Sequence, residues 1–568
     1  MTTRARKYIF VVGGVISGVG KGVATSAIAA LLQAKGLRVT AVKIDPYINI
    51  DAGTMNPTEH GEVFVLEDGD ETDQDMGNYE RFLGVNLSRI NYMTTGRVYQ
   101  EVIRRERNLE YRGKNVEVVP DIPLEVIRRI EASAKKADAD VTLIEVGGTV
   151  GEYQNVLFLE AARMMRIKHP GDIAIVMVSY LPIPSKVGEM KTKPTQHAAR
   201  ALNSVGLQAD VIIARAEQPL DQKRKEKISL LCSVPANRVI SAPDIESIYD
   251  APINYAKDKL GEALTELLYG QPLKHDRSRL AAWEDFAKRR KHAAKKVHIA
   301  IVGKYFSSGE FVMSDVYISV IEALKFSAIA ADAQVQISYI GSPQFEEGKN
   351  LEQLAKYDGI LVPGGFGKNG VEGKINVIRY AREHGIPFFG ICYGMQLAVV
   401  EYARHMLGWQ NAHTAEIAPE TTHPVIDIMP DQKALMQDKN YGGTMRLGTY
   451  PATLRKGTLV HAAYGRTQIK ERHRHRFEVN PRFVAKLSEG GLVFSGTSPD
   501  ARLMETVELP QAVHPYFVAC QFHPEFLARP FAPHPLFSAF IAAALDHRAA
   551  RSESPDATAS KLSWQVTK

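Results

Sequence analysis

Short apolar runs alternate with stretches of helical periodicity along the first half of the chain. The apolar runs are short enough for buried strands, and the stretches between them repeat apolar side chains at helical spacing. This alternation predicts a parallel sheet with helices on both faces, a doubly wound α/β domain over residues 1–272. The predicted strands are 8–12, 38–44, 116–119, 141–146, 173–178 and 210–214, and the clearest helices are 24–35 and 124–134.

A second α/β pattern follows a change in composition near Leu273 and opens with a predicted strand at 297–302. Further apolar runs at 359–362, 386–389 and 516–519 predict a second doubly wound domain over 297–546. Residues 287–296 are rich in Ala, Lys and Arg. This composition favours a solvated helix within a linker at 273–296, with a binding patch as the alternative. The tail, 547–568, is rich in Ser, Ala, Thr and Lys and is expected to be disordered.

Composition narrows the class of protein. The 568 residues are too many for one ordinary core, and contents of 45% hydrophobic and 24% charged residues are typical of soluble globular proteins. The net charge of +6 does not indicate nucleic-acid binding, but it suits anionic nucleotides. Three cysteines give no disulfide framework. No secretory pattern and no membrane-spanning stretch are evident, so we expect a cytoplasmic protein without a membrane partner.

Cys392 lies in the segment Phe389-Gly390-Ile391-Cys392-Tyr393-Gly394, directly after an apolar run. Small residues two before and two after a nucleophile allow a sharp strand-to-helix turn that exposes the side chain. The same turn directs backbone N–H groups at a substrate carbonyl. Cys232 and Cys520 lack such flanks and are expected to be small buried hydrophobes.

A base and its orienting carboxylate follow the last apolar run, in the segment Cys520-Gln521-Phe522-His523-Pro524-Glu525. A strand that ends in His-x-Glu can supply both groups to a thiol nucleophile. Together with Gly364-Gly365, these motifs resemble the triad (class I) glutamine amidotransferases. That resemblance implies that Cys392 attacks the side-chain amide of glutamine and releases ammonia.

A glycine-rich turn, residues 13–22, follows the first strand and opens the first helix. Such a turn with Lys21 at a helix N-terminus can cradle phosphates through backbone N–H groups and the ammonium. It is not a strict P-loop, because Val15 and Gly22 replace the expected Gly and Ser or Thr. It resembles the variant P-loop of dethiobiotin-synthetase-like ligases, which implies an ATP site.

Magnesium ligands for such a site are predicted at Asp75 and at Glu145, which lies near the end of a strand, just before Gly147-Gly148. Lys43, near the end of the second strand, either neutralises phosphoryl charge or pairs with a carboxylate. In the segment 188–197, two lysines and two threonines surround Pro194, which we expect to hold an extended turn. This turn is either a polyanion site or a solvated loop.

Several longer motifs make the resemblance more specific. They are 45–49, 60–65, 71–75, 191–196, 442–448 and 471–476. Together they resemble the CTP synthase family over about residues 7–546. The resemblance implies amination of UTP at the expense of ATP, with GTP as an allosteric activator, CTP as feedback inhibitor and a homotetramer built as a dimer of dimers.

The same resemblance assigns roles to individual residues. ATP would contact Ser17, Gly18, Val19, Gly20, Lys21, Gly22, Asp75, Arg215, Asp244 and Ile245. UTP and CTP would contact Ser17, Glu152, Tyr153, Gln154, Lys191, Thr192, Lys193, Pro194, Thr195, Gln196 and Lys227. Glutamine would contact Gly364, Gly365, Tyr393, Gly394, Met395, Gln396, Glu416 and Arg476. Catalysis would use Cys392, His523, Glu525, Lys21 and Lys43, magnesium would bind Asp75 and Glu145, and Pro57, His60 and Val63 would line an ammonia passage.

One departure concerns residues 152–154, which are Glu-Tyr-Gln where the family commonly has Asp-Ile-Glu. The loss of a charge at Gln154 makes feedback by CTP less secure than the chemistry. Two alternatives stay open. An amidotransferase with a carboxylic acid acceptor would not need the 191–196 segment, and a non-enzymatic homologue would not need Cys392, His523 and Lys21.

Overall fold

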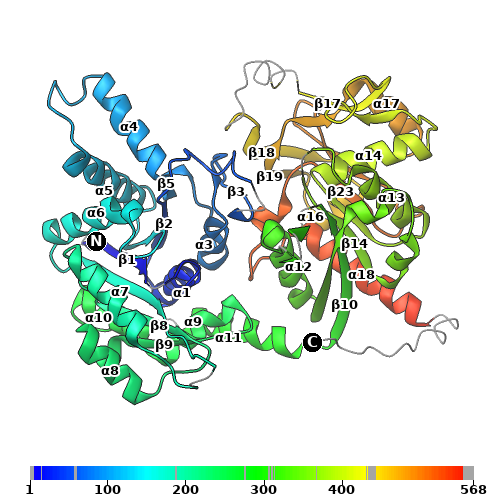
Figure 1. Ribbon diagram of the computed structural model, residues 1–568. Helices are drawn as coiled ribbons and strands as arrows, with labels where there is room; N and C mark the ends of the chain where they lie inside the picture. The colour runs from blue at the N-terminus through cyan, green and yellow to red at the C-terminus, as the bar shows by residue number, and fades with distance from the viewer. Residues whose placement is uncertain are drawn as a thin grey trace. The chain divides into compact units, whose positions relative to one another are not determined.

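The computed structural model describes residues 5–14, 16–56, 60–185, 188–273, 277–304, 307–308, 311–312, 314–365, 367–429, 432 and 443–553. Contacts divide the chain into two compact units (Figure 1). The first unit comprises Met1–Ala52 and Thr72–Lys288, and the second comprises Gly53–Glu71 and Arg289–Lys568. The segment Gly53–Glu71 therefore belongs with the second unit, although the sequence pattern placed it inside the first domain.

The described part of the first unit contains a parallel seven-stranded sheet in the order β5-β2-β6-β1-β7-β8-β9. The predicted strands at 8–12, 38–44, 141–146, 173–178 and 210–214 are confirmed within a few residues. The strands are β1 (Lys7–Gly13), β2 (Val39–Asp45), β5 (Tyr92–Thr94), β6 (Val141–Val146), β7 (Ile173–Tyr180), β8 (Val211–Ala216) and β9 (Val239–Pro243).

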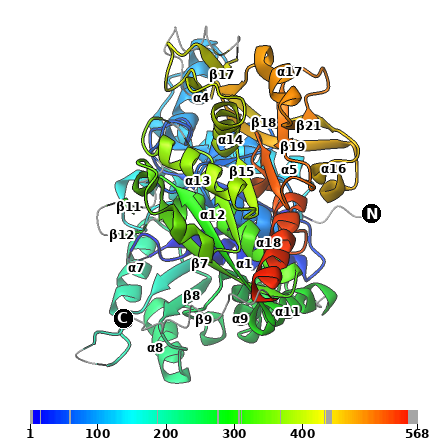
Figure 2. The same cartoon turned by 90° about the vertical axis from the view of Figure 1, so that its right-hand side faces the viewer.

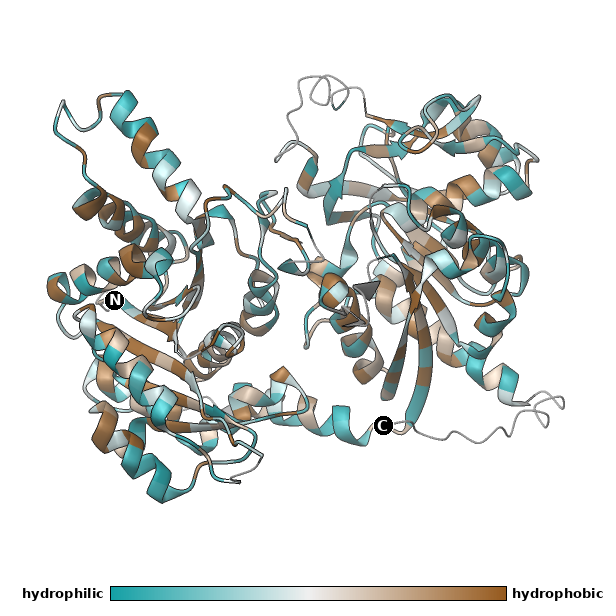
Figure 3. Ribbon diagram, in the orientation of Figure 1, coloured by the Kyte–Doolittle hydropathy of each residue, from teal (hydrophilic) through white to brown (hydrophobic). Residues whose placement is uncertain are grey.

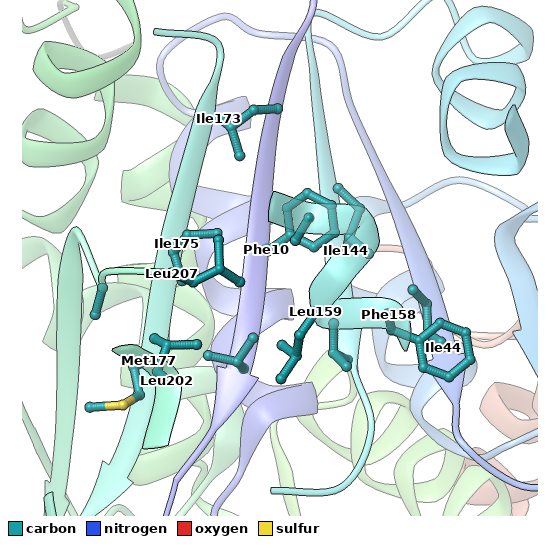
Figure 4. Packing of buried hydrophobic residues seen from close by; sticks show 14 of the residues in the cluster. Phe10, Ile44, Ile144, Phe158, Leu159, Ile173, Ile175, Met177, Leu202 and Leu207 are labelled. Atoms are coloured by element: carbon teal, nitrogen blue, oxygen red, sulfur yellow. The ribbon is translucent and has the colours of Figure 1, made fainter. Parts of the chain in front are cut away.

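Helices cover both faces of this sheet. Its helices are α1 (Lys21–Gln33), α3 (Asp75–Leu83), α4 (Thr95–Arg107), α5 (Val118–Lys136), α6 (Val156–Lys168), α7 (Lys193–Ser204), α8 (Gln222–Cys232), α9 (Ala251–Lys257) and α10 (Leu260–Tyr269). Phe10 of β1 and Ile144 of β6 pack against Phe158 and Leu159 of α6 (Figure 4). Helices α3, α9 and α10 instead pack against α1. The predicted doubly wound architecture is confirmed.

The predicted strand at 116–119 is wrong. Residues 118 and 119 belong to the start of α5, where Val118 is 52% exposed and Val119 is 48% exposed. An apolar run forms a buried strand only where other strands pair with it. None of the described strands pairs with residues 116–119.

The described part of the second unit contains a nine-stranded sheet in the order β13-β10-β14-β15-β23-β22-β21-β18-β19. The strands from β13 to β23 are parallel, and the next four pair antiparallel. They are β10 (Lys295–Gly303), β13 (Ala333–Gly341), β14 (Gly359–Val362), β15 (Phe388–Ile391), β18 (Arg446–Leu454), β19 (Gln468–His475), β21 (Val493–Thr497), β22 (Met504–Glu508) and β23 (Phe517–Cys520). A three-stranded sheet adds β16 (Ala412–Thr414), β17 (His423–Ile428) and β20 (Phe477–Val479).

The helices of the second unit pack in two groups, α13 with α14 and α12 with α18. They are α12 (Ile318–Ala330), α13 (Val371–Glu383), α14 (Tyr393–His405), α16 (Leu459–Tyr464), α17 (Pro481–Glu489) and α18 (Pro535–Glu553). Alternation along β15 separates the groups. Phe389 contacts Phe537 and Phe540 of α18, whereas Phe388 belongs to the core formed with α13 and α14. The ribbons of β15 and of these helices can be followed in Figure 2. The central strands are mainly hydrophobic, whereas many helices carry both hydrophobic and hydrophilic residues (Figure 3).

The predicted linker and the expected disordered tail both contain helix. Helix α11 (Arg277–His292) occupies most of the predicted linker, as the composition of its basic end favours. The expected disordered tail begins too early, because α18 continues to Glu553 and Arg551 donates to the carbonyl of Tyr357 at 2.9 Å. Residues 554–568 lie outside the described residues. Among the helices that the structure describes, none is both long and apolar enough to cross a membrane.

Segment Gly53–Glu71 is held in the second unit by buried polar contacts, and it includes the short strand β3 (Phe64–Val65). Arg472 donates to the Val65 carbonyl at 3.0 Å, and Arg474 pairs with Glu71 at 2.8 Å. The Glu62 carboxylate accepts from the Ser319 backbone N–H at 3.2 Å. These three attachments fix the segment in the second unit, and one of its partners, Arg474, lies beside Cys392.

Candidate active sites

The glycine-rich turn forms the predicted strand–turn–helix arrangement between β1 and α1. Gly20 has a φ of 87° and directly precedes α1, and the buried Lys21 begins the helix. The Lys21 ammonium donates to the Gly148 carbonyl at 2.8 Å. A Cβ atom on Gly13 would lie 2.9 Å from Lys21 Nζ, so the glycine makes room for this lysine. Ser17 and Gly18 are exposed, Val19 is buried, and Val15 lies outside the described residues.

Lys43 bridges the two predicted magnesium ligands. Its ammonium donates to Asp75 at 2.5 Å and to Glu145 at 2.8 Å, and Lys43 and Glu145 are paired neighbours on β2 and β6. Tyr79 donates to the second oxygen of Glu145. The structure thus shows Lys43 paired with carboxylates, one of the two roles that the sequence left open. Lys43 is also close enough to Lys21 for its charge to add to the effect of burial and lower the pKa of Lys21.

Burial sets the electrostatics of this cluster. It opposes the charge on Lys43, but Asp75 and Glu145 outweigh it and raise the pKa of Lys43 well above its usual value. Burial raises the pKa of Glu145, which Lys43 only partly offsets. For Asp75 the charge and hydrogen bond of Lys43 overcome burial and lower the pKa. Burial lowers the pKa of Lys21, although Glu145 and Asp75 oppose the shift. The charge of Lys43 therefore opposes protonation of both carboxylates, outweighing burial at Asp75 and partly offsetting it at Glu145.

The pair Asp75 and Glu145 fits the chemistry of magnesium. Both supply carboxylate oxygens, the ligand type that magnesium prefers, and magnesium sites in nucleotide enzymes commonly combine one or two carboxylates with phosphate oxygens and water. Among the described residues, no cluster of three or more His, Cys, Asp or Glu could hold a metal ion without such help. The residues therefore suit a metal that arrives with a phosphate.

The replacement of the P-loop Ser or Thr by Gly22 has a structural reason. A Cβ atom on Gly22 would lie 2.1 Å from Asp75 Oδ1, much closer than any non-bonded contact allows. The Asp75 carboxylate thus stands where the hydroxyl-bearing side chain of a strict P-loop begins. An acidic oxygen from α3 takes the place of a hydroxyl from α1.

The predicted ATP contacts Arg215, Asp244 and Ile245 lie at the other flank of the turn. Arg215, on β8, donates to the Val19 carbonyl at 3.3 Å and pairs with Asp244 at 2.8 Å. A Cβ atom on Gly20 would lie 2.9 Å from Arg215 Nη1. Ile245 follows Asp244 in the chain and is half-buried. Arg215 and Asp244 therefore lie against the phosphate turn.

The 152–154 segment closes over the loop that follows β6. The Glu152 carboxylate accepts from Thr149 and, at 2.6 Å, from Gln154. A Cβ atom on Gly148 would lie 2.6 Å from Glu152 Oε2. Tyr153 is 99% exposed. Gln154 thus uses its amide to hold Glu152, a contact that a glutamate at this position could not make.

The expected extended turn around Pro194 is wrong. Lys193, Pro194, Thr195 and Gln196 form the first turn of α7, because proline is well tolerated at the start of a helix, where its missing N–H has no partner to lose. Thr195 shares a hydrogen bond with Ser179 at 2.8 Å, and Gln196 donates to Thr192 at 3.0 Å.

The basic side chains at this end of α7 remain accessible. Lys193 is exposed, and the half-buried Lys191 pairs with Glu189 at 2.7 Å. Lys227 on α8 is exposed and acts electrostatically on the same Glu189. The structure thus brings Lys191, Lys193 and Lys227 to one helix N-terminus, where backbone N–H groups and the helix dipole favour anions.

In the second unit, Cys392 forms the predicted nucleophile elbow between β15 and α14. Its backbone has φ 51° and ψ −100°, the strained turn that lifts a side chain out of the sheet. A Cβ atom on Gly390 would lie 2.9 Å from the Gly394 backbone, and one on Gly394 would lie 2.2 Å from the Val362 carbonyl. The structure therefore requires the small residues before and after the nucleophile, as the sequence indicated.

His523 and Glu525 complete a triad with Cys392. His523 Nδ1 and Glu525 Oε1 are 2.7 Å apart, and both residues are buried. Burial disfavours the imidazolium, but the charges of Glu525 and Cys392 outweigh it and raise the pKa of His523 to about 10. The ring stacks on Phe526 with a centroid distance of 5.1 Å. At neutral pH His523 is therefore poised to hold a proton beside the thiol.

A cavity of about 70 Å³ lies at this triad. Its walls include Cys392, His523, Gly364 and Gly365, with Glu62 and Val63 from the early segment. A Cβ atom on Gly364 would lie 3.1 Å from His523 Cε1 and 3.7 Å from Cys392 Cβ, so only glycine leaves this approach open. His60 is exposed, and Pro57 lies outside the described residues.

Several of the predicted glutamine-binding residues form hydrogen bonds within the protein. The Gln396 amide donates to the Phe477 carbonyl at 2.7 Å and to Gln521 at 3.2 Å, so its donors support the protein itself. Met395 is fully buried in the core. Glu416 accepts from the Gly367 N–H at 2.9 Å, and burial raises its pKa. Arg476 donates to Gln432 at 2.7 Å.

Three residues near Cys392 have no role that the sequence pattern predicted. Gln521 donates to its sulfur at 3.6 Å, and the sulfur lies 3.8 Å from the Arg474 carbonyl. The third is Lys374, buried beneath the Gly364-Gly365 turn. Gln521 lies within the motif that contains His523, so its position in the sequence could have revealed it. Cys232 and Cys520 are buried, as predicted.

The triad elbow of one unit and the phosphate turn of the other define the chain as a class I glutamine amidotransferase joined to a nucleotide-dependent ligase. Residues 7–269 match the family model "CTP synthase N-terminus", and residues 312–543 match "Glutamine amidotransferase class-I". The chain belongs to the CTP synthase family.

Curated relatives match almost end to end. A CTP synthase from Listeria innocua is 46% identical over 95% of this chain and 100% of its own length. One from Thermococcus gammatolerans is 49% identical over 95% of this chain and 99% of its own. Among solved structures, the glutaminase domain of Trypanosoma brucei CTPS with bound acivicin is 36% identical. It covers 44% of this chain and 94% of that chain, with a TM-score of 0.41.

Proposed function

We propose that this enzyme, a glutamine-hydrolysing ligase of its family, converts UTP to CTP by phosphorylating O4 of the uracil ring and displacing that phosphate with ammonia. The observation that carries the proposal is that one chain holds both a Cys392–His523–Glu525 elbow and a buried Lys43–Asp75–Glu145 cluster beside the Lys21 turn. An amidotransferase that lacked the second site would have no means of activating an oxygen as a leaving group.

In the glutaminase half, Cys392 Sγ attacks the glutamine amide carbon and forms a thioester. The N–H groups of the Gly364-Gly365 turn and of Tyr393 receive the developing oxyanion. His523 delivers its proton to the departing ammonia, and Glu525 fixes the ring and its charge. Water then cleaves the thioester to glutamate. Glu416 and Arg476 present opposite charges to the α-amino and α-carboxylate groups of glutamine.

In the synthetase half, the turn 17–22 and Lys21 hold the ATP phosphates, with Arg215, Asp244 and Ile245 toward the adenine. Lys191, Lys193, Lys227 and the N-terminus of α7 hold the UTP phosphates, with Thr192, Pro194, Thr195 and Gln196 shaping that turn. Magnesium, held by Asp75 and Glu145, supplies charge neutralisation during phosphoryl transfer when bound. Lys43 stabilises the transferred charge as the γ-phosphoryl group moves from ATP to O4.

Regulation and assembly follow from family membership as part of the same proposal. CTP would bind over the UTP site through the 152–154 and 191–196 segments, GTP would activate glutamine hydrolysis, and the enzyme would form a tetramer in the cytoplasm. Ammonia would pass along the segment that contains His60 and Val63. The position of Val63 in the wall of the Cys392 cavity supports this route for ammonia.

The decisive experiment compares the wild type with Cys392→Ala in an assay of CTP formation from UTP, ATP and magnesium. With glutamine as nitrogen donor, the variant should form no CTP. With ammonium chloride it should match the wild type, because the synthetase site is intact. Equal loss with both donors would refute the division of labour, and wild-type inactivity with both would favour a non-enzymatic homologue. Activity only with a carboxylic acid acceptor in place of UTP would identify the other alternative.

A further inference from the structure

Lys374 is a fully buried lysine that the chemistry above does not use. It lies in α13 with no measurable exposure to solvent. Among the described residues, no carboxylate lies within ion-pair distance of its ammonium. A lysine is rarely buried without a paired charge, because removal of an ammonium from water is costly. Such a group in a functional unit calls for an explanation beyond packing.

The Lys374 ammonium interacts with two residues that border the active site, through the backbone carbonyl of one and the aromatic ring of the other. It donates to the Pro363 carbonyl at 3.5 Å, and Pro363 directly precedes Gly364-Gly365. It also lies 5.4 Å from the ring centroid of Tyr393, the residue that follows Cys392. A cation over an aromatic face is attracted to it. One side chain therefore links the two places from which the oxyanion hole draws its N–H groups.

The contact with Pro363 has a directional consequence. In a trans peptide the carbonyl and the following N–H point in opposite directions. A cation that holds the Pro363 carbonyl below the turn therefore turns the Gly364 N–H away from α13. Gly364 itself lies against His523 and Cys392.

The surrounding charges give Lys374 no permanent counter-ion in the described structure. Lys304 also lies 5.4 Å from the Tyr393 ring and donates to the Gly367 carbonyl at 2.8 Å, where the Gly367 N–H is bound by Glu416. Burial and the charge of Lys304 lower the pKa of Lys374 to about 7, and Cys392 opposes this shift. The anionic form of Cys392 is thus the charge that favours the ammonium.

We propose that Lys374 is a positioning residue for glutamine hydrolysis, whose ammonium holds the Pro363 carbonyl and the Tyr393 ring and thereby fixes the N–H groups of the oxyanion hole around Cys392. This inference rests on the proposed glutaminase function. If Lys374 served only the structure, its replacement would lower the stability of the fold. If it serves to position the active site, its replacement by an apolar side chain of similar size should leave stability unchanged or raise it, because the buried ammonium has no paired charge.

The test uses full-length Lys374→Met, with Lys368→Met as matched control, because Lys368 is an exposed lysine in the loop that precedes α13. Glutamate release is measured over a range of glutamine concentrations, together with ammonia-dependent CTP formation and the melting temperature. For Lys374→Met we expect kcat for glutamine hydrolysis to fall about 100-fold, as for the loss of other oxyanion-hole support. KM for glutamine should change less than about threefold. Ammonia-dependent activity should be unchanged, and the melting temperature equal or higher.

A second measurement separates charge from packing. Iodoacetamide should alkylate Cys392 of Lys374→Met several-fold more slowly at neutral pH than in the wild type and in Lys368→Met, because the thiolate has lost a neighbouring cation. Unchanged kcat and unchanged alkylation would overturn the proposal. So would a loss of both activities in step with a lower melting temperature, which would mark Lys374 as structural. Glutamine hydrolysis that survives in Cys392→Ala would instead overturn the proposed function itself.

Discussion

Asp75 Oδ1 lies 2.1 Å from the position that a Cβ atom would take on Gly22. The glycine that departs from the P-loop pattern and the carboxylate proposed to hold magnesium are thus two parts of one arrangement. Lys43 completes it by donating to Asp75 at 2.5 Å. The chain therefore has the Asp75 carboxylate in place of the hydroxyl of a P-loop Ser or Thr. The carboxylate fits there because residue 22 has no side chain.

Gly22→Ser, which restores the usual P-loop residue, should therefore inactivate the synthetase. The new Cβ displaces the Asp75 carboxylate, and a displacement of about 1 Å at a catalytic group can cost about 100-fold in rate. We expect loss of CTP formation from both glutamine and ammonia, with glutamate release retained. Gly341→Ser is the control, because Gly341 has an ordinary φ of −72° and the nearest atom to its Cβ position beyond its chain neighbours, Pro343 Cδ, lies 3.9 Å away. Full activity of Gly22→Ser would show that Asp75 does not need its present position.

Lys43→Met should make the cluster dependent on a divalent cation. Without the lysine, Asp75 and Glu145 are left unpaired, and the removal of one partner from a buried pair costs about 3–5 kcal/mol. The pKa of Glu145 is already raised by burial, and loss of Lys43 raises it further. The folded state then holds a proton that the unfolded state releases near pH 4.3. Stability of the variant should therefore fall more steeply than that of the wild type as pH rises from there.

The measurement is the melting temperature of Lys43→Met against pH, with and without magnesium. Magnesium should raise it more than in the wild type, because no ammonium competes for the two carboxylates. Lys35→Met is the matched control, since Lys35 is also buried and pairs with Glu262 at 2.7 Å. An equal magnesium response in both variants would argue against metal binding by Asp75 and Glu145.

Much of the fold could be predicted because its strands are buried on both faces. β1 and β6 are continuous apolar runs in a sheet covered by helices, and such runs are visible without any partner. The strand at 116–119 failed for the converse reason, since a short apolar run does not reveal whether neighbours will cover it. The antiparallel strands β18 and β19 went unpredicted because β18 is partly exposed and β19 carries several charged residues, so neither forms a continuous apolar run.

The candidate site shows the same division. Cys392, His523 and Glu525 could be found because each chemical role needs a particular residue type at a local spacing. The first turn of α7 was taken for an extended segment because Pro194 suits both the start of a helix and a turn. The attachment of Gly53–Glu71 depends on contacts between segments far apart in the sequence, and the role of Lys374 depends on its complete burial, and no local pattern encodes either.

Glu525→Gln should impair glutamine hydrolysis and flatten its stability profile. The charge of Glu525 helps to raise the pKa of His523 from about 6.5 to about 10. Such a raised pKa contributes stability that is fully present below about pH 6.5 and is lost as pH rises through about 10. The variant lacks most of that contribution, so its deficit in unfolding free energy should shrink between those two values.

The rate of glutamate release by Glu525→Gln should fall about 100-fold to 10,000-fold, while ammonia-dependent CTP formation persists. Glu401→Gln is the control, because Glu401 is buried in α14 and pairs with Arg382 at 2.8 Å and His405 at 3.3 Å. It should lose stability without a selective loss of hydrolysis. A stability deficit of Glu525→Gln that stays constant with pH would contradict the proposed charge on His523.

Glu71→Gln should reduce the efficiency with which released ammonia is used. Glu71 pairs with Arg474, whose carbonyl lies 3.8 Å from Cys392 Sγ, and Glu71 ends the segment whose Glu62 and Val63 wall the Cys392 cavity. Four residues further along the chain stands Asp75. Loss of the buried charge pair should loosen this wall and let ammonia escape to solvent.

The ratio of CTP formed to glutamate released, near one in a coupled enzyme, should then fall clearly below one in Glu71→Gln. Glu67→Gln, an exposed change in the same segment, should keep the wild-type ratio. If Glu71→Gln slows both products equally, the pair serves hydrolysis alone, and the retention of ammonia depends on other contacts.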